Sequence, residues 1–471
     1  MKKILMFLLL VPTFVFSQNK DELISKINHL LDNDFFKSTS AAINIYNLTK
    51  DESLYQLNSK LLLHPASNMK ILTTTAALVF LGPDYEFTTS LYYTGNIVNG
   101  ILYGDLYAVG GCDPDFTSKD LDSMTAEFKK LGVKEIFGNI YGDVSMIDTL
   151  FWGNGWMWDD DPSTDEMYLS ALNINDNAIE VKVNVENNNP KVTLNPQSNF
   201  TEVEFNSFVG DQENNSALII DRDWLNRKNT ILIKRNLKKD LPNNFQTSAR
   251  LNVWQPEFYF LTLLEESLQK QGIKFNGIKE IQAAPEETIQ AFKFERGFDS
   301  VIVNLNKVSD NLSAEMTLRA IGEKYFGKPS SAKKGLKLID SLIVLSGLNP
   351  DDYRLVDGSG VSHYNLVSAE LLLSVLKFIY NNHPGLYKIL YHSFPIAGVD
   401  GTLENRMINT SAQNNVHAKT GTLSGVASLS GYVTSKSGDQ IVFSILMQNY
   451  VGSSRTARDV QDKICELLAE Y

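Results

Sequence analysis

A serine and a lysine three residues apart, Ser67 and Lys70, begin a stretch that is otherwise almost entirely apolar. Residues three apart on a helix share a face, so the hydroxyl and the ammonium group would lie side by side. Burying an unpaired charge is costly, and Lys70 therefore needs polar neighbours or must lose its proton. A neutral lysine can act as the base that activates a neighbouring hydroxyl. Taken alone, the pair fits a structural role and a catalytic role equally well.

The element that carries this pair is predicted to be a helix from Ser67 to Leu81, ended by Gly82-Pro83. Its apolar residues leave no wide polar face, which is typical of a helix buried at the centre of a domain. Other Ser-x-x-Lys spacings, such as Ser330 to Lys333, lie where a solvated loop or an ordinary helix face explains them. The apolar context therefore distinguishes the first pair, and the spacing alone does not.

Two later triplets carry side chains of the same kinds. Ser309-Asp310-Asn311 stands at the start of a predicted helix, where such a cluster usually serves as an N-terminal cap. Lys419-Thr420-Gly421, followed by Thr422, lies in a predicted strand, and its glycine would let a ligand approach the backbone closely. A near copy, Lys436-Ser437-Gly438, falls in a polar hairpin turn, which explains it without chemistry. The order of the motifs is more informative than any one of them.

The order Ser-x-x-Lys, Ser-Asp-Asn, Lys-Thr-Gly resembles the motif set of class A β-lactamases and penicillin-binding proteins. With its long insertion between the first two motifs, the chain resembles the D-alanyl-D-alanine carboxypeptidase/endopeptidase family, the low-molecular-mass class C penicillin-binding proteins. Four further strings resemble that family: "DGSGVSHYNLVS" from Asp357, "PIAGVDGTLENRM" from Pro395, "SALNINDNAIEV" and "VGGCDPDF". Two departures are His363, at an arginine-like position, and Cys112, in a glycine-rich pattern. The resemblance covers nearly the whole mature chain.

This resemblance implies an enzyme that hydrolyses peptidoglycan stem peptides or their cross-links through an acyl-enzyme on Ser67 and is inhibited by β-lactams. Lys70 would be the base, and Lys419 would both lower the pKa of Lys70 and hold a substrate carboxylate. A second ammonium about 4 Å away would supply roughly 4 kcal/mol toward a neutral Lys70 at an effective dielectric constant near 20. Ser309 would relay a proton to the leaving amine, and Asn311 would bind the substrate amide.

Substrate-binding groups follow from the same resemblance. The backbone N–H groups of Ser67 and Thr422 would form an oxyanion hole, where loss of one donor typically slows a reaction about 10²- to 10³-fold. Thr420 and Thr422, on either side of Gly421, would bind the terminal carboxylate. In "GWMWDDDP", Asp160 best matches a family aspartate that reaches the amino group of the stem's diamino acid, and a solvated acidic loop is the alternative. No cofactor is expected.

The expected fold is α/β, with a β-lactamase/transpeptidase-like domain, an antiparallel sheet flanked by helices, split by a large β-rich insertion. Strands at both ends of the chain with helices between them indicate one discontinuous domain, residues 18–84 and 290–471. Residues 85–289 contain many strand-like segments separated by Asn- and Gly-rich turns. They form the inserted unit, for which two nested domains are expected.

The first residues predict a secretory signal peptide, residues 1–17, in which two lysines precede an apolar run too short to span a bilayer. A short membrane anchor is the alternative. The mature protein is therefore expected in the periplasm or on the extracellular face of the cell envelope, with peripheral membrane contact and oligomeric state left open. In that oxidising setting Cys112 and Cys465 could pair, but two cysteines form no disulfide framework, so free thiols are the favoured expectation.

Composition excludes other classes. The 471-residue chain is 43% hydrophobic and 21% charged, which argues against disorder, and its net charge of −12 argues against a nucleic-acid partner. No spacing typical of a metal site occurs.

Three other functions are alternatives to the family's hydrolase activity. A β-lactamase or esterase of the same superfamily is disfavoured by the insertion and by the lack of a recognisable deacylating glutamate segment. A non-catalytic penicillin-binding or sensing protein would not need a poised base. A conventional Ser-His-Asp hydrolase is disfavoured because the sequence contains no GxSxG motif.

Overall fold

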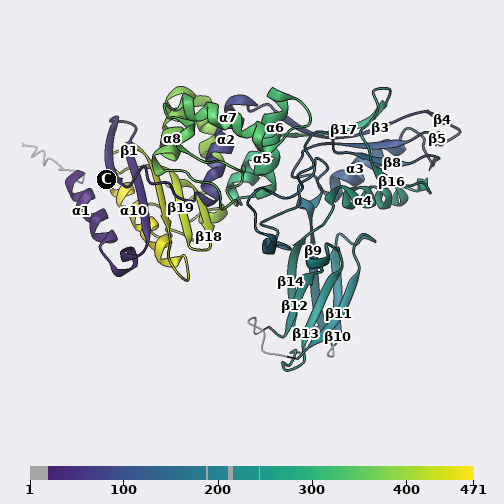
Figure 1. The fold of residues 1–471 in the computed structure, drawn as a ribbon, viewed down its shortest axis with the longest axis horizontal. Coiled ribbons are helices and arrows are strands. Elements are labelled where there is room, and N and C mark those ends of the chain that lie inside the picture. Colours follow the sequence, from purple (N-terminus) through teal and green to yellow (C-terminus); the bar gives the residue numbers. More distant parts are fainter. Residues whose placement is uncertain (1–19, 187–188, 210–215, 243) are drawn as a thin grey trace, which may run out of the picture.

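The structure is a computed structural model that describes residues 20–186, 189–209, 216–242 and 244–471. Figure 1 shows a body that holds both ends of the described chain, a second body that extends from it, and a lobe that projects from their junction. The predicted signal peptide, residues 1–17, lies outside the described residues.

A five-stranded antiparallel sheet joins the two ends of the chain. Its order is β18-β19-β20-β1-β2, so the first strand of the chain pairs with the last, with Ile43 opposite Ile445. This is the predicted antiparallel sheet. Its strands are β1 (Ser40–Asn47), β2 (Glu52–Leu57), β18 (His417–Leu423), β19 (Val426–Thr434) and β20 (Gln440–Gln448).

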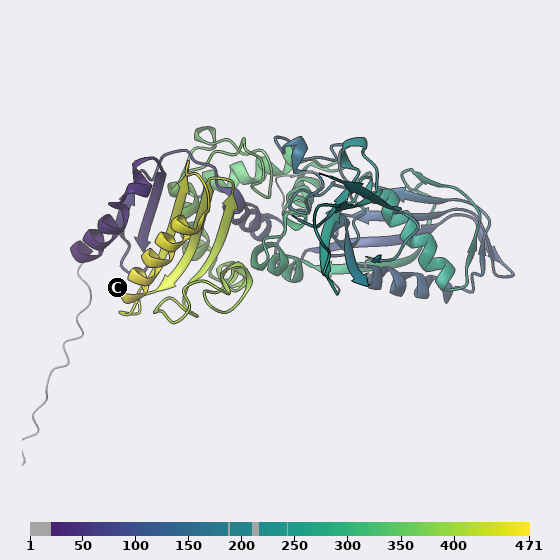
Figure 2. The ribbon, with the colours of Figure 1, turned by 90° about the horizontal axis from the view of Figure 1, so that it is seen from below.

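Helices cover both faces of this sheet, as predicted. Alternate residues of the central strands, such as Ile43 and Phe443, share a core with α1 and α10, and Figure 2 shows α10 lying across that face. Ala42 and Val442 point the other way, into a core with the remaining helices. Side chains alternate along a strand, so one apolar run serves both layers. The helices are α1 (Lys20–Leu31), α2 (Met69–Phe80), α5 (Phe298–Lys307), α6 (Asn311–Phe326), α7 (Ala332–Leu345), α8 (Ala369–Asn382), α9 (Pro384–Ser393) and α10 (Arg455–Glu470).

Helix α2 lies within the helical layer, and ten of its twelve residues are buried. It begins at Met69, whereas Ser67 belongs to a single 3₁₀ turn, η2 (Ala66–Asn68). The predicted helix start is therefore two residues early, because Ala66 has a left-handed φ of 46° that turns the chain just before the serine. The predicted stop is confirmed, since Gly82, with φ 86°, follows the end of the helix.

The second body consists of two sheets, in the orders β16-β8-β6-β3-β17 and β15-β7-β5-β4. They share an apolar core with α3 (Ser118–Lys129) and with α4 (Pro256–Lys270). Because β17 pairs with β3 along its length, the strand that starts at residue 289 belongs with this sheet. The strands are β3 (Glu86–Tyr93), β4 (Asn96–Val98), β5 (Ile101–Tyr103), β6 (Leu106–Gly111), β7 (Glu135–Ile136), β8 (Ile140–Asp143), β15 (Lys274–Phe275), β16 (Lys279–Ile281) and β17 (Ile289–Gly297).

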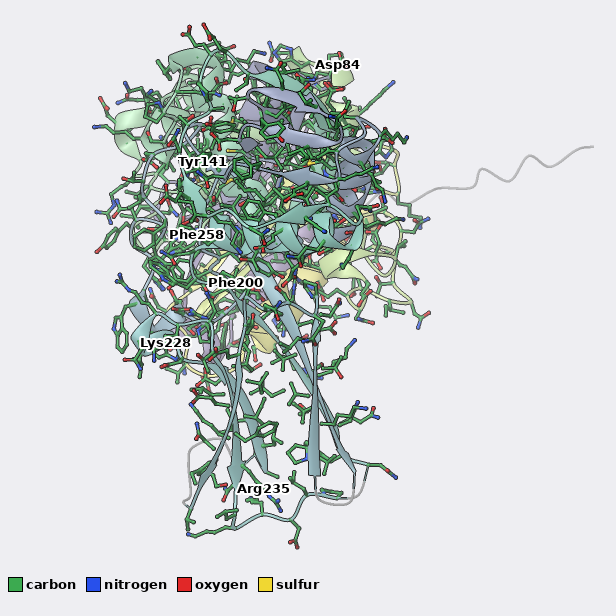
Figure 3. All side chains as sticks on the ribbon, turned by 90° about the vertical axis from the view of Figure 1, so that its right-hand side faces the viewer. Asp84, Tyr141, Phe200, Lys228, Arg235 and Phe258 are labelled. Carbon is green, nitrogen blue, oxygen red and sulfur yellow. The ribbon has the colours of Figure 1, made fainter. Side chains whose placement is uncertain are left out.

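The projecting lobe, seen pointing downward in Figures 1 and 3, consists of two three-stranded sheets in the orders β10-β9-β14 and β11-β13-β12. Among the described strands, β9 to β14 pair only with one another, which sets the lobe apart from the rest of the insertion. The strands are β9 (Ala178–Glu186), β10 (Asn189–Asn195), β11 (Val203–Phe208), β12 (Leu218–Arg222), β13 (Ile231–Asn236) and β14 (Gln246–Asn252).

The remaining elements are short. The 3₁₀ turns besides η2 are η1 (Asp34–Lys37), η3 (Trp158–Asp160), η4 (Asn175–Asn177), η5 (Trp224–Asn226), η6 (Pro350–Asp352) and η7 (Gly401–Leu403).

Cys112 and Cys465 are both buried and are free thiols. Among the described residues, no helix has both the length and the apolar character needed to cross a membrane. The same part of the chain contains no cluster of three or more His, Cys, Asp or Glu side chains suited to a metal ion.

Candidate active site

Ser67 and Lys70 lie side by side, as the spacing predicts. Lys70 Nζ is 3.0 Å from Ser67 Oγ, and the lysine side chain is 0% exposed whereas the serine is half-buried. Lys70 Nζ also donates to the carbonyl oxygen of Ser359, at 2.9 Å, and to Oδ1 of Asn311. Two further oxygen atoms therefore hold the buried amine against the hydroxyl of Ser67.

Burial lowers the pKa of Lys70 to about 8, although nearby carboxylates, first among them Asp310, partly offset that effect. The pKa of Lys419 is lowered well below its ordinary value by burial and then by repulsion from Lys70. The sequence-based expectation made Lys419 the main cause of the low pKa of Lys70, with burial adding to it. That expectation is corrected here: burial is the main cause, and the repulsion between the amines acts on Lys419.

Lys419 forms a second amine–hydroxyl pair across from the first, with Nζ donating to Ser309 Oγ at 2.9 Å. Ser309 has a left-handed φ of 69°, a conformation that non-glycine residues adopt at a cost of about 1–3 kcal/mol. The next residue, Asp310, is the N-cap of α6, and its carboxylate accepts from the N–H of Ser313 at 2.5 Å. The predicted cap is thus Asp310, and the residues on either side of it, Ser309 and Asn311, line the cleft.

Strand β18 packs directly against the turn that carries Ser67, and Gly421 makes this approach possible. A Cβ at this position would lie 2.9 Å from Ser67 N, 2.9 Å from Pro65 O and 2.2 Å from Ser428 Oγ. Ser428 is not free to move, because its hydroxyl donates to Pro65 O at 2.7 Å. The sequence suggested that Gly421 lets a ligand approach the backbone closely. In the structure, the group that approaches Gly421 is the turn that carries Ser67. Asn68 adds a further tie, donating to the carbonyl oxygen of Lys419 at 3.0 Å.

A turn at residues 357–360 lies behind Ser67 and supplies the carbonyl oxygen that contacts Lys70. Gly360 has φ 90°, and a Cβ there would lie 1.9 Å from the carbonyl oxygen of Ala66. Glu315, which is 1% exposed, accepts from the N–H groups of Gly358 and Ser359 at 2.8 and 2.9 Å, and pairs with the buried Arg319 at 2.9 Å. The turn is therefore fixed by a buried ion pair on α6.

Asp357 ties this turn to the inserted segment. Its carboxylate accepts from the indole N–H of Trp156 at 3.0 Å and from the backbone N–H groups of Gly360 and Ser362 at 2.9 and 2.7 Å. The amide of Asn365 adds a fourth donor at 2.7 Å. Because Trp156 belongs to the segment that follows β8, the insertion contacts the structure behind Ser67 directly.

The cleft in front of Ser67 has a volume of about 400 Å³. Most of the residues predicted for the site line it: Ser67, Ser309, Asn311, Thr420, Gly421 and Thr422. The two lysines lie behind this lining and are fully buried.

Asp160 is not among the cleft's lining residues; its side chain accepts from the N–H of Met157 at 2.9 Å and caps its own turn. Its role in substrate binding stays a prediction. Asp165 and Glu166 of the same segment do line the cleft, and the carbonyl oxygen of Asp165 accepts from Asn311 at 2.6 Å.

Several lining residues had no assigned role at the sequence level. Thr402 lies with its hydroxyl oxygen 2.7 Å from that of Thr420, and Arg406, which donates to the carbonyl oxygen of Arg458 at 3.3 Å, lines the cleft together with Arg458. Two of the strings that resembled the family contain Thr402, Arg406 and Ser359. The resemblance of these strings to the family was visible in the sequence, but it did not indicate which residues of each string face Ser67.

Comparison with known proteins agrees with this geometry. The family model of the D-Ala-D-Ala carboxypeptidase 3 (S13) family matches residues 23–471. The chain belongs to the S13 family of D-Ala-D-Ala carboxypeptidases. The predicted family and the predicted enzyme class, a serine-type D-Ala-D-Ala carboxypeptidase, are thereby confirmed.

Relatives of this S13 chain include the D-alanyl-D-alanine carboxypeptidase DacB of Haemophilus influenzae, 30% identical over 86% of this chain and 84% of the relative. The D-alanyl-D-alanine carboxypeptidase of an Actinomadura species is 31% identical, over 96% of this chain and 85% of the relative.

The crystal structure of penicillin-binding protein 4 (dacB) from Haemophilus influenzae superposes with a TM-score of 0.84 at 28% identity, covering 94% of this chain and 99% of the other. A second structure of that protein, in complex with a β-lactam, gives a TM-score of 0.79 at 27% identity, covering 95% and 100%. The predicted fold class is confirmed by these superpositions.

Proposed function

We propose that this S13 enzyme hydrolyses the D-Ala-D-Ala ends of peptidoglycan stem peptides, and also their cross-links, through an acyl-enzyme on Ser67. The observation that carries the proposal is the pair of amine–hydroxyl contacts at one cleft. Lys70 Nζ lies 3.0 Å from Ser67 Oγ, and Lys419 Nζ lies 2.9 Å from Ser309 Oγ. One pair supplies a nucleophile with its base, and the other supplies a hydroxyl that can pass a proton on.

In the acylation step, neutral Lys70 takes the proton of the Ser67 hydroxyl as Oγ bonds to the carbonyl carbon of the penultimate D-Ala. The resulting oxyanion is stabilised by the backbone N–H groups of Ser67 and Thr422. The C–N bond then breaks as the leaving amine receives a proton through Ser309. Water later attacks the ester, releases the shortened peptide and returns the proton to Ser67 Oγ.

The terminal carboxylate of the substrate fits the end of the cleft where cations and hydroxyls gather. We assign it to Lys419, Thr420 and Thr422, as the resemblance to the family predicts, with Arg458 at the same end. The other guanidinium there, that of Arg406, is already paired with Asp462 at 2.6 Å. Asn311 is placed for the substrate amide, and it must exchange its contact with Asp165 or Lys70 for the substrate.

An acidic side chain of the inserted segment is proposed to bind the amino group of the stem's diamino acid. Asp160 is the residue predicted from the sequence, and Asp165 is one of two acids of that segment that line the cleft. With a substrate whose diamino acid carries a free amine, Asp160→Asn is expected to raise KM with little change in kcat. The matched variant Asp165→Asn tests the alternative, and a change for Asp165→Asn alone would remove Asp160 from the site.

The proposed location is outside the cytoplasm, in the periplasm or on the extracellular face of the envelope. The signal-like residues 1–17 and the location of peptidoglycan support this proposal. Peptidoglycan peptides are then the natural partner of the cleft, and β-lactams its covalent inhibitors. N-terminal sequencing of the exported protein tests the location, since a chain still starting at Met1 contradicts cleavage after Ser17.

Two experiments test the activity. After exposure to penicillin, mass spectrometry of the purified protein should locate one adduct on Ser67, and Ser67→Ala should form none. Ser67→Ala should also lose D-Ala release from a pentapeptide that ends in D-Ala-D-Ala. Release of D-Ala at the wild-type rate by Ser67→Ala would overturn the proposal.

The lifetime of the adduct separates the related activities. Rapid loss of the adduct with turnover of penicillin would indicate a β-lactamase in place of a carboxypeptidase. A stable adduct without D-Ala release would indicate a protein that only binds or senses penicillin. The structure favours catalysis, because burying two lysines against hydroxyls is costly and a binding function does not require it.

A further inference from the structure

An aromatic groove of about 370 Å³ lies at the root of the projecting lobe. It is lined by the rings of Phe151, Trp152, Trp158, Tyr168 and Trp224, and by Arg227. Figure 3 labels Lys228, the neighbour of Arg227, at the level where the lobe meets the rest of the molecule. None of these residues has a role in the chemistry described above.

Ring faces in the aromatic groove are open to solvent. Trp158 is 71% exposed and Phe151 is 41% exposed, although aromatic side chains of this size are usually well buried. The rings of Trp158 and Trp224 lie 5.3 Å apart and are tilted by 39°, so two indoles from separate segments present neighbouring surfaces. An exposed aromatic surface of this kind marks a binding site more often than chance exposure does.

The floor of the aromatic groove is held rigidly in place. Tyr168 donates from its hydroxyl to Asp161 at 2.7 Å, and Asp161 is also paired with Arg222, which is buried. Arg222 in turn donates to Asn252 at 3.0 Å. The one carboxylate that lines the groove is therefore already neutralised, and the shape of the floor is set before any ligand binds.

The polar groups that remain for a ligand are donors. The guanidinium of Arg227 lies over the rings of Phe151 and Trp254, 5.8 and 5.3 Å from their centroids. Within the described part of the chain it makes no hydrogen bond or ion pair. The indole N–H of Trp152 is buried and likewise has no acceptor there. A ligand that suits this groove has flat apolar faces together with neutral acceptors such as hydroxyl or acetamido oxygens.

The groove and the catalytic cleft are lined by one continuous segment, residues 151–168. The N-terminal part of this segment contributes Trp152 and Trp158 to the groove, and its later part contributes Asp165 to the cleft. Between them, Trp156 is fixed to Asp357 behind the nucleophile. One short segment therefore connects the groove to the cleft.

We infer that the aromatic groove binds the sugar part of the cell-wall substrate, an N-acetylated amino sugar to which the stem peptide is attached. This inference rests on the proposed function. A pyranose ring presents C–H groups that pack on an indole face, while its hydroxyl and acetamido oxygens accept from guanidinium and indole N–H groups. A cationic peptide fits less well, since the groove offers no unpaired carboxylate. An anionic membrane surface fits less well because Asp159 and Asp160 directly follow Trp158.

A comparison of two substrates tests the inference. One is a pentapeptide ending in D-Ala-D-Ala, and the other is the same peptide joined to an N-acetylated disaccharide. For Trp158→Ala, kcat/KM for the disaccharide-bearing substrate should fall about two- to tenfold, in line with the loss of one aromatic contact. The kcat/KM for the free peptide should not change. The matched control is Phe137→Ala, which removes an exposed aromatic ring (70%) elsewhere on the insertion and should affect neither substrate.

Competition gives a second readout. The disaccharide without peptide should raise the apparent KM of the disaccharide-bearing substrate for the wild type but not for Trp158→Ala. Equal effects of Trp158→Ala on both substrates, or no effect on either, would overturn the sugar site and leave the proposed function intact. Loss of binding to anionic vesicles in Trp158→Ala, with no difference between the substrates, would assign the surface to a membrane instead. If the wild type cleaves neither substrate, the proposed function itself fails.

Discussion

Gly421→Ala is expected to slow acylation of Ser67 while leaving the fold intact. The added Cβ would lie 2.9 Å from Ser67 N and from Pro65 O, and 2.2 Å from Ser428 Oγ. Ser428 cannot turn away without losing its hydrogen bond to Pro65. The backbone of β18 must therefore move away from the turn that carries the nucleophile.

The size of this effect follows from the distances. Ordinary contact begins at 3.4 Å, so the 2.9 Å contacts require a movement of about 0.5 Å. A misplacement of about 1 Å can cost about 10²-fold in rate, and loss of one oxyanion donor costs about 10²- to 10³-fold. We expect the acylation rate constant to fall about 10- to 100-fold, because the N–H groups of Ser67 and Thr422 would no longer converge. The overpacking should cost about 1–3 kcal/mol of unfolding free energy.

The assay is the second-order rate constant for acylation by a fluorescent penicillin, measured beside the unfolding free energy. Gly438→Ala is the matched control, since Gly438 belongs to the near-copy Lys-Ser-Gly in a hairpin turn. Its φ is 85° and nothing lies within 4 Å of its Cβ position, so alanine there brings about 1–2 kcal/mol of backbone strain without crowding Ser67. Equal acylation rates for Gly421→Ala and the wild type would refute the argument. A slowed Gly438→Ala would show that lost stability, and not crowding, reduces the rate.

Three further outcomes are expected. The acylation rate of the wild type should rise tenfold per pH unit below the pKa of Lys70, about 8, and level off above it, because only the neutral amine accepts the proton of Ser67. An acylation rate that does not change between pH 6 and pH 8 would exclude Lys70 as the base. Glu315→Gln should shift this rise in rate to lower pH, since the charge of Glu315 raises the pKa of Lys70. The same variant should lose about 3–5 kcal/mol of unfolding free energy, because Arg319 stays buried without its partner. Glu315→Asp keeps the charge and should leave the pH dependence of the rate unchanged. Trp156→Phe should lower the unfolding free energy by about 1.5–3 kcal/mol through loss of the hydrogen bond to Asp357, and Trp158→Phe, at an exposed position, should not. Denaturant unfolding measures both variants, and equal unfolding free energies for Trp156→Phe and the wild type would contradict the role of this hydrogen bond.

Local pattern was sufficient for most elements of the fold that position the site. The apolar run after Ser67 and the stop at Gly82 predicted α2, and the strands at both ends of the chain indicated one discontinuous domain, whose antiparallel sheet the resemblance to the family implied. The helix start was misplaced, because the left-handed turn at Ala66 results from packing against Gly360 and has no signal of its own.

The sequence by itself determined which side chains could do chemistry: two Lys–Ser combinations and an amide, in an order typical of one enzyme family. It could not determine the contacts that set their chemistry, because those join segments hundreds of residues apart. The carbonyl oxygen of Ser359 against Lys70 and the close approach of Gly421 to Ser67 exist only once the sheet closes and the helices pack. Burial lowers the pKa of Lys70, and burial is a property of the whole fold. For that reason only the tertiary structure could decide which groups surround the buried amine.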